Sequence, residues 1–235
     1  MQPPGKNYET GDGLSILVVV AHPDDEVLGV GGAIARYCRG GEKVHILIVA
    51  DGETSRSGRS TGAVEKRIHA AAAAAKILGA QVPQMLGFAD QRLDTVTLLE
   101  IVRQIETIVR ETSPYIVYTH HPSDLNNDHR IVAMATLTAC RPLGDTPVRN
   151  IYAFETPSST EWSPPGPMNF VPRRFVDISA TLRIKLDALR CYSDEMRPFP
   201  HPRSNKAIEA LAHWRGATAG FAAAEAFDVL RELES

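Results

Sequence analysis

Short apolar runs alternate with longer helical patterns along the first 150 residues of the chain. Runs rich in β-branched residues, which predict buried strands, lie at 15–21, 44–50 and 115–119, with weaker ones at 84–88 and 148–154. Helical patterns that end at glycine or shortly before proline lie at 26–39, 63–78, 98–111 and 129–141. The alternation predicts right-handed βαβ units and an α/β fold, in which a doubly wound, mainly parallel sheet carries helices on both faces.

The rest of the chain adds a long connection and two helical patterns. Residues 156–172 are rich in proline, serine and glycine, and a segment of this length indicates a lid or a substrate loop. Helical patterns follow at 182–192 and 205–233. Because 235 residues with 43% apolar content suffice for one core, we expect a single domain over 1–235, with residues 1–13 as a flexible N-terminal tail.

Charge and cysteine content exclude several classes of protein. A net charge of −3 does not provide the basic face that nucleic acid requires, so no nucleic-acid partner is expected. The three cysteines, Cys38, Cys140 and Cys191, are widely spaced, which argues against a disulfide framework and a cysteine zinc cluster. No apolar run approaches the roughly 18 residues that span a bilayer, and no signal pattern is present. We therefore expect a cytoplasmic protein without a transmembrane segment.

Unusual residues follow three of the predicted strands. Ligands of open α/β sheets bind beyond the carboxyl ends of the strands, so these turns are the first place to look for a site. The turns are AHPDDE at 21–26, ADGETSR at 50–56 and THHPSDLNNDH at 119–129.

The first turn pairs a histidine with three consecutive acids. Pro23 disfavours the helical region for His22, so His22 stays extended while Asp24 to Glu26 begin the next helix, and His22 and Asp25 can then face one point. The alternative is that Asp24 or Asp25 caps the helix and Glu26 complements its dipole. A divalent cation explains the histidine as well, and a mixture of imidazole and carboxylate ligands suits zinc.

A catalytic zinc usually has three protein ligands and one open position. The third turn supplies His129 at a helix start, although His120 and His121 compete with it. If His129 completes the set, Asp24 has no ligand role and becomes the predicted general base, taking a proton as water attacks a carbonyl. The expected reaction class is metal-assisted hydrolysis of an amide or ester.

The three motifs HPDDE, DGETSR and HPSDLNNDHR, in this order, resemble the PIG-L/LmbE family of zinc-dependent N-acetylglucosamine deacetylases. The resemblance implies a Rossmann-like fold and an enzyme that removes the acetyl group from an N-acetylated amino sugar or sugar conjugate. It implies Zn²⁺, or another divalent metal, on His22, Asp25 and His129, with Asp24 as the general base.

One position departs from the family pattern. Many members carry a histidine three residues before the last ligand, paired through the intervening acid, which is Asp128 here; this chain has Asn126. Asparagine can donate a hydrogen bond to an oxyanion but cannot deliver a proton. Our hypothesis is that Asp24 returns its proton to the leaving amine, with His121 or His201, which are also candidates for substrate binding, as the reserve acid.

Further candidates for substrate binding lie in loops. Glu53 and Arg56 follow the second strand, and Arg203 lies in a late HPRS segment, where each could bind sugar hydroxyls or an anionic group. Trp162 could stack on a sugar ring. The alternatives are surface ion pairs for the charged residues and a hydrophobic anchor for the tryptophan.

Rival functions were weighed against the hydrolase. A dinucleotide site fails because the spacing of Gly29 and Gly31 demands a small residue at Ile34, and a serine hydrolase lacks its G-x-S-x-G turn. An amidase for a larger N-acyl or thiol conjugate, and a weakly active sugar-binding module that keeps the metal site, stay open. The expected partner is a small N-acetylated sugar or glycoconjugate, and analogy with related enzymes adds a homo-oligomer.

Overall fold

The structure, a computed structural model, describes residues 13–55, 62–144, 146–166 and 168–234. Residues 1–12 of the predicted tail and Arg56 lie outside these ranges. The strands are β1 (Ser15–Val20), β2 (Lys43–Ala50), β3 (Gln84–Phe88), β4 (Ile116–His120), β5 (Asn150–Phe154), β6 (Arg174–Asp177) and β7 (Ala224–Glu232). The helices are α1 (Asp25–Gly40), α2 (Ala63–Leu78), α3 (Leu98–Thr112), α4 (Asn127–Ala139), α5 (Leu182–Leu189) and α6 (Asn205–Ala219). Short 3₁₀ turns are η1 (Leu93–Thr95), η2 (Thr160–Trp162) and η3 (Arg190–Tyr192).

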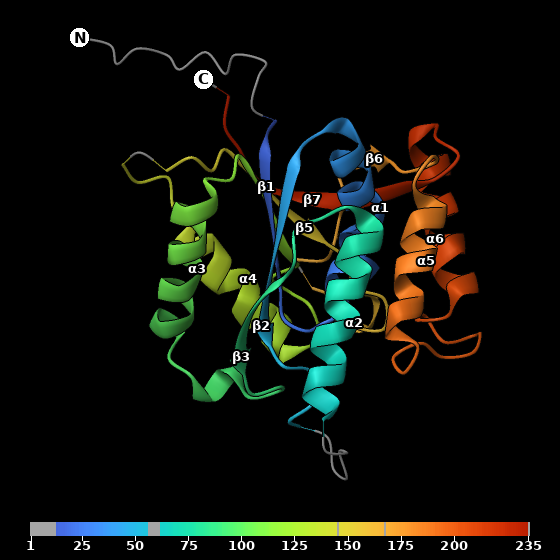
Figure 1. Ribbon diagram of the computed structural model, residues 1–235. Coiled ribbons are helices and arrows are strands. Elements are labelled where there is room, and N and C mark those ends of the chain that lie inside the picture. The colour runs from blue at the N-terminus through green and yellow to red at the C-terminus, as the bar shows by residue number, and fades with distance from the viewer. Residues whose placement is uncertain (1–12, 56–61, 145, 167, 235) are drawn as a thin grey trace.

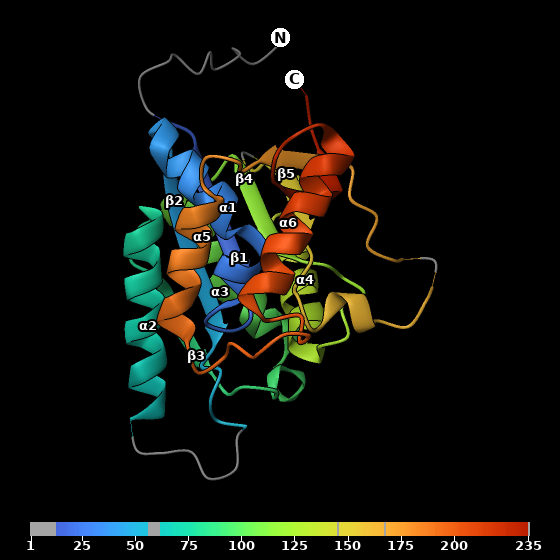
Figure 2. The same cartoon turned by 90° about the vertical axis from the view of Figure 1, so that its right-hand side faces the viewer.

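One sheet forms the centre of the molecule, with strand order β3-β2-β1-β4-β5-β7-β6. The pairs among β1 to β5 are parallel, and β7 runs antiparallel to both β5 and β6. Helices α3 and α4 cover one face, and α1, α2, α5 and α6 cover the other (Figures 1 and 2). The predicted α/β fold, with a mainly parallel sheet between two helical layers, is confirmed.

Two apolar clusters, one on each face, hold the layers together. In β1, Ile16, Val18 and Val20 pack into the cluster under α1 and α2, while Leu17 and Val19 pack into the cluster under α3 and α4. A strand buried on both faces has no polar positions along its length, which is why β1 shows as a continuous apolar run in the sequence.

Among the described helices, none is long and apolar enough to cross a membrane.

The prediction of one helix over 205–233 was wrong. Helix α6 ends at Ala219 because Gly220 adopts a left-handed conformation (φ 79°), and the chain then turns back into β7. The alanines of this segment favour a helix by propensity, but their position decides otherwise. Backbone of β7 pairs with β5 on one side and with β6 on the other, and β6 itself was not predicted.

Candidate metal centre

The turn after β1 places three acids in three different environments. Asp24 has φ 125°, a region that costs a residue with a side chain about 1–3 kcal/mol, and its side chain makes no capping hydrogen bond. Asp25 Oδ2 accepts a hydrogen bond from the backbone N–H of His22, at 2.9 Å, before the helix begins. Asp24 is the N-cap residue of α1 by position, but neither aspartate side chain caps the helix, so capping does not account for these two acids.

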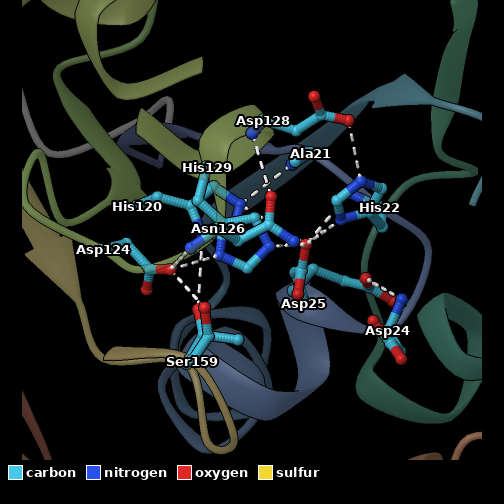
Figure 3. Close-up of polar contacts among 12 residues, drawn as sticks. Ala21, His22, Asp24, Asp25, His120, Asp124, Asn126, Asp128, His129 and Ser159 are labelled. Atoms are coloured by element: carbon cyan, nitrogen blue, oxygen red, sulfur yellow. Dashed lines mark hydrogen bonds and ion pairs between the residues drawn. The ribbon is translucent and has the colours of Figure 1, made fainter. Parts of the chain in front are cut away.

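His22, Asp25 and His129 converge on one point, although the third lies more than 100 residues from the first two. The Asp25 Oδ2 atom lies 3.4 Å from His22 Nδ1 and 3.3 Å from His129 Nε2. One donor atom from each of the three residues can be chosen so that all lie within 4.8 Å of one another, and the residues are buried. Figure 3 shows the two imidazoles and the carboxylate facing one another.

Two atoms of this cluster lack hydrogen-bond partners. Among the described residues, Asp25 Oδ1 and His129 Nε2 are both buried and form no hydrogen bond. An unsatisfied buried polar atom is costly, and a charged one more so. A divalent cation would satisfy both atoms, because carboxylate oxygen and imidazole nitrogen are ordinary metal ligands. The residues present thus fit a metal ion.

A second set of carboxylates holds the far nitrogens of the two imidazoles. His129 Nδ1 lies 3.1 Å from Asp124 Oδ1. His22 Nε2 lies 3.1 Å from Asp128 Oδ2 and 3.0 Å from Asp90 Oδ1. This is the arrangement in which a metal-ligating histidine donates its other N–H to a carboxylate, which fixes the ring and raises its basicity.

His22, Asp90 and Asp128 also lie close enough to hold an ion. The oxygens of Asp128 already accept backbone hydrogen bonds from Gln91 and Leu93, at 2.8 and 3.2 Å. The geometry favours a supporting role for these acids, since it leaves His22 Nδ1 free to face Asp25.

The competing histidines have other partners. His120 Nε2 accepts a hydrogen bond from the backbone N–H of Ala21 at 2.9 Å, so this nitrogen is unprotonated and occupied. Burial and the neighbouring His129 lower the pKa of His120 to about 4, which keeps it neutral. His121 contacts Asp228 and Ser123 rather than the cluster. The geometry therefore selects His129 from the three candidates.

Electrostatics in the cluster follow from its pairing. Burial alone would raise the pKa of Asp25, but the facing His129 imidazole holds it well below the usual range. Burial opposes protonation of His22 and His129, yet the surrounding carboxylates raise the pKa of both rings. Burial likewise acts against ionisation of Asp124, but hydrogen bonds and the charge of His129 bring its pKa to about 2. The site attracts positive charge.

Asp24 points away from the cluster (Figure 3), and its carboxylate contacts two arginines. Its Oδ2 lies 2.9 Å from Arg203 Nη1 and 4.0 Å from Arg67 Nη1. Burial raises the pKa of Asp24, and Arg203 acts in the opposite direction. Its backbone N–H donates to Glu26 Oε2 at 3.0 Å, which holds the strained residue in place.

Glu26 is the third acid of the turn, and it has its own partner. The Tyr192 hydroxyl donates to Glu26 Oε1 at 2.5 Å. Burial raises the pKa of Glu26 to about 7, although the hydrogen bonds from Tyr192 and the Asp24 backbone lower it.

The other predicted residues lie around the cluster. Asn126 caps α4, because its Oδ1 accepts the Asp128 backbone N–H at 2.9 Å. Glu53 pairs with Arg67 at 3.3 Å. His201 Nδ1 accepts the backbone N–H of Arg203 at 3.0 Å, and its ring meets Trp162 edge-on at 6.2 Å.

Sequence reasoning missed Asp90 and Arg67 and gave Asp124 no role of its own. Asp90 lies two residues after the end of β3, which was a weak strand in the sequence, so the strand-end rule could have found it. Arg67 lies inside a helical pattern where a solvated position was the simpler interpretation, and only its burial in the fold distinguishes it.

The chain is similar in sequence and fold to several known proteins. Residues 17–140 match the family model PIG-L, described as GlcNAc-PI de-N-acetylase. The chain is 31% identical over 181 residues to the "Uncharacterized deacetylase YaiS" of Escherichia coli K12, covering 74% of this chain and 88% of that protein. It is 32% identical over 207 residues to the 4-oxalmesaconate hydratase of Pseudomonas putida KT2440, covering 77% and 74%. Its fold matches N,N'-diacetylchitobiose deacetylase from Pyrococcus horikoshii with a TM-score of 0.75, at 20% identity and over 94% and 85% of the two chains.

Proposed function

We propose, because this chain belongs to the PIG-L family, that it is a zinc-dependent hydrolase that removes the acetyl group from an N-acetylated amino sugar or sugar conjugate. One observation carries the proposal. His22, Asp25 and His129 come together with two buried atoms that lack hydrogen-bond partners, next to the ionisable Asp24. Two histidines and one carboxylate are a donor set that suits a catalytic zinc ion, and the neighbouring carboxylate of Asp24 is our candidate for the base.

The residues divide the reaction between them. A bound zinc ion would lower the pKa of a water molecule and polarise the amide carbonyl. We assign to Asp24 the role of accepting the proton of the attacking water, because it adjoins the ligand Asp25 in the chain and is not itself one of the grouped donor residues. Arg203, 2.9 Å from Asp24 Oδ2, favours the ionised form that a general base needs.

Protonation of the leaving amine also falls to Asp24 in this proposal. Asn126 uses its carbonyl oxygen as a helix cap, so only its amide group can face a substrate, and that group donates a hydrogen bond but no proton. Asp128 is committed to His22 and two backbone N–H groups. His121 and His201 have the partners described above, which favours Asp24 as the group that carries the proton in both directions.

The remaining assignments extend the same proposal. We assign Glu53 and Arg203 to contacts with sugar hydroxyls. Arg203 contacts Asp24 directly, and Glu53 contacts Arg67, the second arginine that faces Asp24. Cys38, Cys140 and Cys191 are free thiols, which supports a cytoplasmic location. We further propose one catalytic domain, and a homo-oligomer by analogy with related enzymes.

Acetate release tests the function. The protein is assayed against a panel of N-acetylhexosamine derivatives, as purified, after chelation and after addition of zinc, alongside metal analysis. Loss of acetate release on chelation and its return with zinc supports the deacetylase. Release of a longer acyl group alone would identify the larger-amide amidase, and tight sugar binding without release would identify the sugar-binding module. Asp24→Asn should reduce kcat by at least 100-fold; turnover within a few-fold of wild type would contradict the role of Asp24.

A second candidate rests on the hydratase relative. That protein is named for the hydration of 4-oxalmesaconate, and it is as similar to this chain as the deacetylase from E. coli. Asn126 favours this candidate, because it removes the histidine that a deacetylase of the usual pattern carries. Consumption of 4-oxalmesaconate, followed by its ultraviolet absorbance, with no acetate release from any sugar would establish the hydratase instead.

A further inference from the structure

A pocket of about 260 Å³ lies beside the candidate metal centre, between the chain at 155–161 and the N-terminal half of α6. Its lining is mostly apolar: Pro157, Pro200, Pro202, Ala207 and Leu211. A cavity of about 150 Å³ lined by apolar groups is enough to bind benzene, so this pocket has room for one ring or a short alkyl chain. It is smaller than the pockets that enclose a whole ligand of drug size.

Two separate contacts join the pocket wall to the metal centre. Thr156 lines the pocket, and its hydroxyl lies 3.3 Å from Nδ1 of His120, which stacks on His129 with ring centroids 3.9 Å apart. Pro157 also lines the pocket, and its carbonyl oxygen accepts from Arg203 Nε at 3.4 Å. The same guanidinium contacts Asp24. One residue therefore separates the pocket wall from the ligand His129 on the first path and from Asp24 on the second.

The charges around the pocket disfavour an anionic group. Its lining includes the acids Glu155 and Glu161 and, within the described part of the chain, no lysine, arginine or histidine. Arg215 forms a bidentate ion pair with Glu155, with both hydrogen bonds at 2.7 Å, so the charge of Arg215 is already paired. Glu161 accepts backbone hydrogen bonds from Ser158 and Ser159. A phosphate or carboxylate placed here would meet the Glu161 carboxylate, while the guanidinium groups of Arg203 and Arg215 at the wall are already paired with Asp24 and Glu155.

We infer that this pocket is a subsite for an uncharged, apolar aglycone, so that the substrate is a neutral glycoconjugate with an apolar group attached next to the N-acetylated sugar. The inference rests on the proposed deacetylase function and names its substrate class. It selects against conjugates whose first group beyond the sugar is a phosphate or a carboxylate. The aglycone gains affinity by leaving water, whereas the sugar ring and its acetamide stay at the metal centre.

Four substrates test the inference: N-acetylglucosamine, its methyl glycoside, its phenyl glycoside and its 1-phosphate. Acetate release should show a KM about tenfold lower for the phenyl glycoside than for the methyl glycoside, which corresponds to about 1.4 kcal/mol. The 1-phosphate should be no better than the free sugar. Equal KM values for the phenyl and methyl glycosides, with acetate released from both, would overturn the inference and leave the deacetylase function intact.

A matched pair of variants locates the effect. Ala207→Gln places a long polar side chain in the pocket, whereas Ala210→Gln makes the same change on an exposed position of the same helix. The first variant should remove the tenfold preference and leave KM for the free sugar unchanged, and the second should keep the preference. Loss of the preference in both variants, or in neither, would contradict the assignment.

Binding of the deacetylated products separates this inference from the proposed function. Phenyl glucosaminide should bind about tenfold more tightly than methyl glucosaminide in titration calorimetry, and Ala207→Gln should abolish the difference. If no sugar releases acetate but this difference is present, the pocket assignment stands and the deacetylase proposal fails. If neither difference appears, the pocket assignment fails as well.

Discussion

Replacing Asp124 by asparagine removes the charge that holds His129 while keeping the shape of the side chain. The Asp124 carboxylate accepts from His129 Nδ1 at 3.1 Å, from Thr160 Oγ1 at 2.5 Å and from Ser159 Oγ. Despite burial, which would raise it, these contacts bring the pKa of Asp124 from 3.8 to about 2. In the metal-free protein, a pKa difference of this size contributes about 2 kcal/mol of folding free energy at neutral pH.

The sign of the pH dependence follows from the lowered pKa. Because the folded state binds the Asp124 proton less readily than the unfolded state, this stability is fully present above pH 3.8 and is lost as the pH falls toward 2. The difference in unfolding free energy between wild type and Asp124→Asn should therefore be about 2 kcal/mol at pH 7 and about 1 kcal/mol at pH 3.

Urea unfolding of both proteins in the presence of a chelator measures this difference. Asp94→Asn, on an exposed position, serves as the control and should change stability by less than about 0.5 kcal/mol. A competition titration with zinc should in addition show an affinity lower by about 10- to 100-fold for Asp124→Asn, since the carboxylate orients a ligand. A deficit that is the same at pH 7 and pH 3, or zinc affinity equal to wild type, would refute the reasoning.

Other changes probe the base, the packing of α1 and the metal. Arg203→Met should move the acidic limb of the kcat/KM profile to higher pH, because burial raises the pKa of Asp24 and Arg203 lowers it. An unchanged limb would show that Arg203 does not act on the base. Gly29→Ala should lower the free energy of unfolding, measured in urea, by about 3 kcal/mol, because a Cβ there would lie 2.2 Å from the Phe154 ring. A loss below about 1 kcal/mol would mean that the ring moves aside freely. Zinc at 100 times its Kd should stabilise the chelated protein by about 2.7 kcal/mol in thermal unfolding, and His129→Ala should lose this gain if it is a ligand.

Local pattern was sufficient for most of the fold, and the exceptions share a cause. Strands β1 and β2 are buried on both faces, so their apolar runs are long enough to identify without any neighbour. Strand β6 has four residues, of which only Val176 is fully buried, so its sequence carries little signal. Strand β7 is alanine-rich at its start and becomes a strand because β5 and β6 offer it backbone partners. Such partners are not visible in a single sequence.

The same distinction applies to the site. His22 and Asp25 could be paired from the sequence because a strand end, a proline and a helix start fix their relative positions. His129 could not be separated from His120 and His121 in this way, because the choice depends on which imidazole nitrogen is already occupied. The Ala21 backbone N–H donates to Nε2 of His120, and these two residues are 99 positions apart in the sequence.

Three consecutive like charges suggest that all three acids share one cation. In the structure, each of the three instead has a separate partner. Successive residues of a helix point about 100° apart, so the start of α1 sends Asp25 into the ligand set and Glu26 toward Tyr192. The unusual backbone of Asp24 turns its carboxylate toward Arg203 instead. Each acid thus has its own partner: Asp25 faces two imidazoles, Glu26 binds a phenol and Asp24 binds a guanidinium. The order of the residues, rather than their total charge, is what the site requires, and exchanging Asp25 with Glu26 would disrupt it although the composition stays the same.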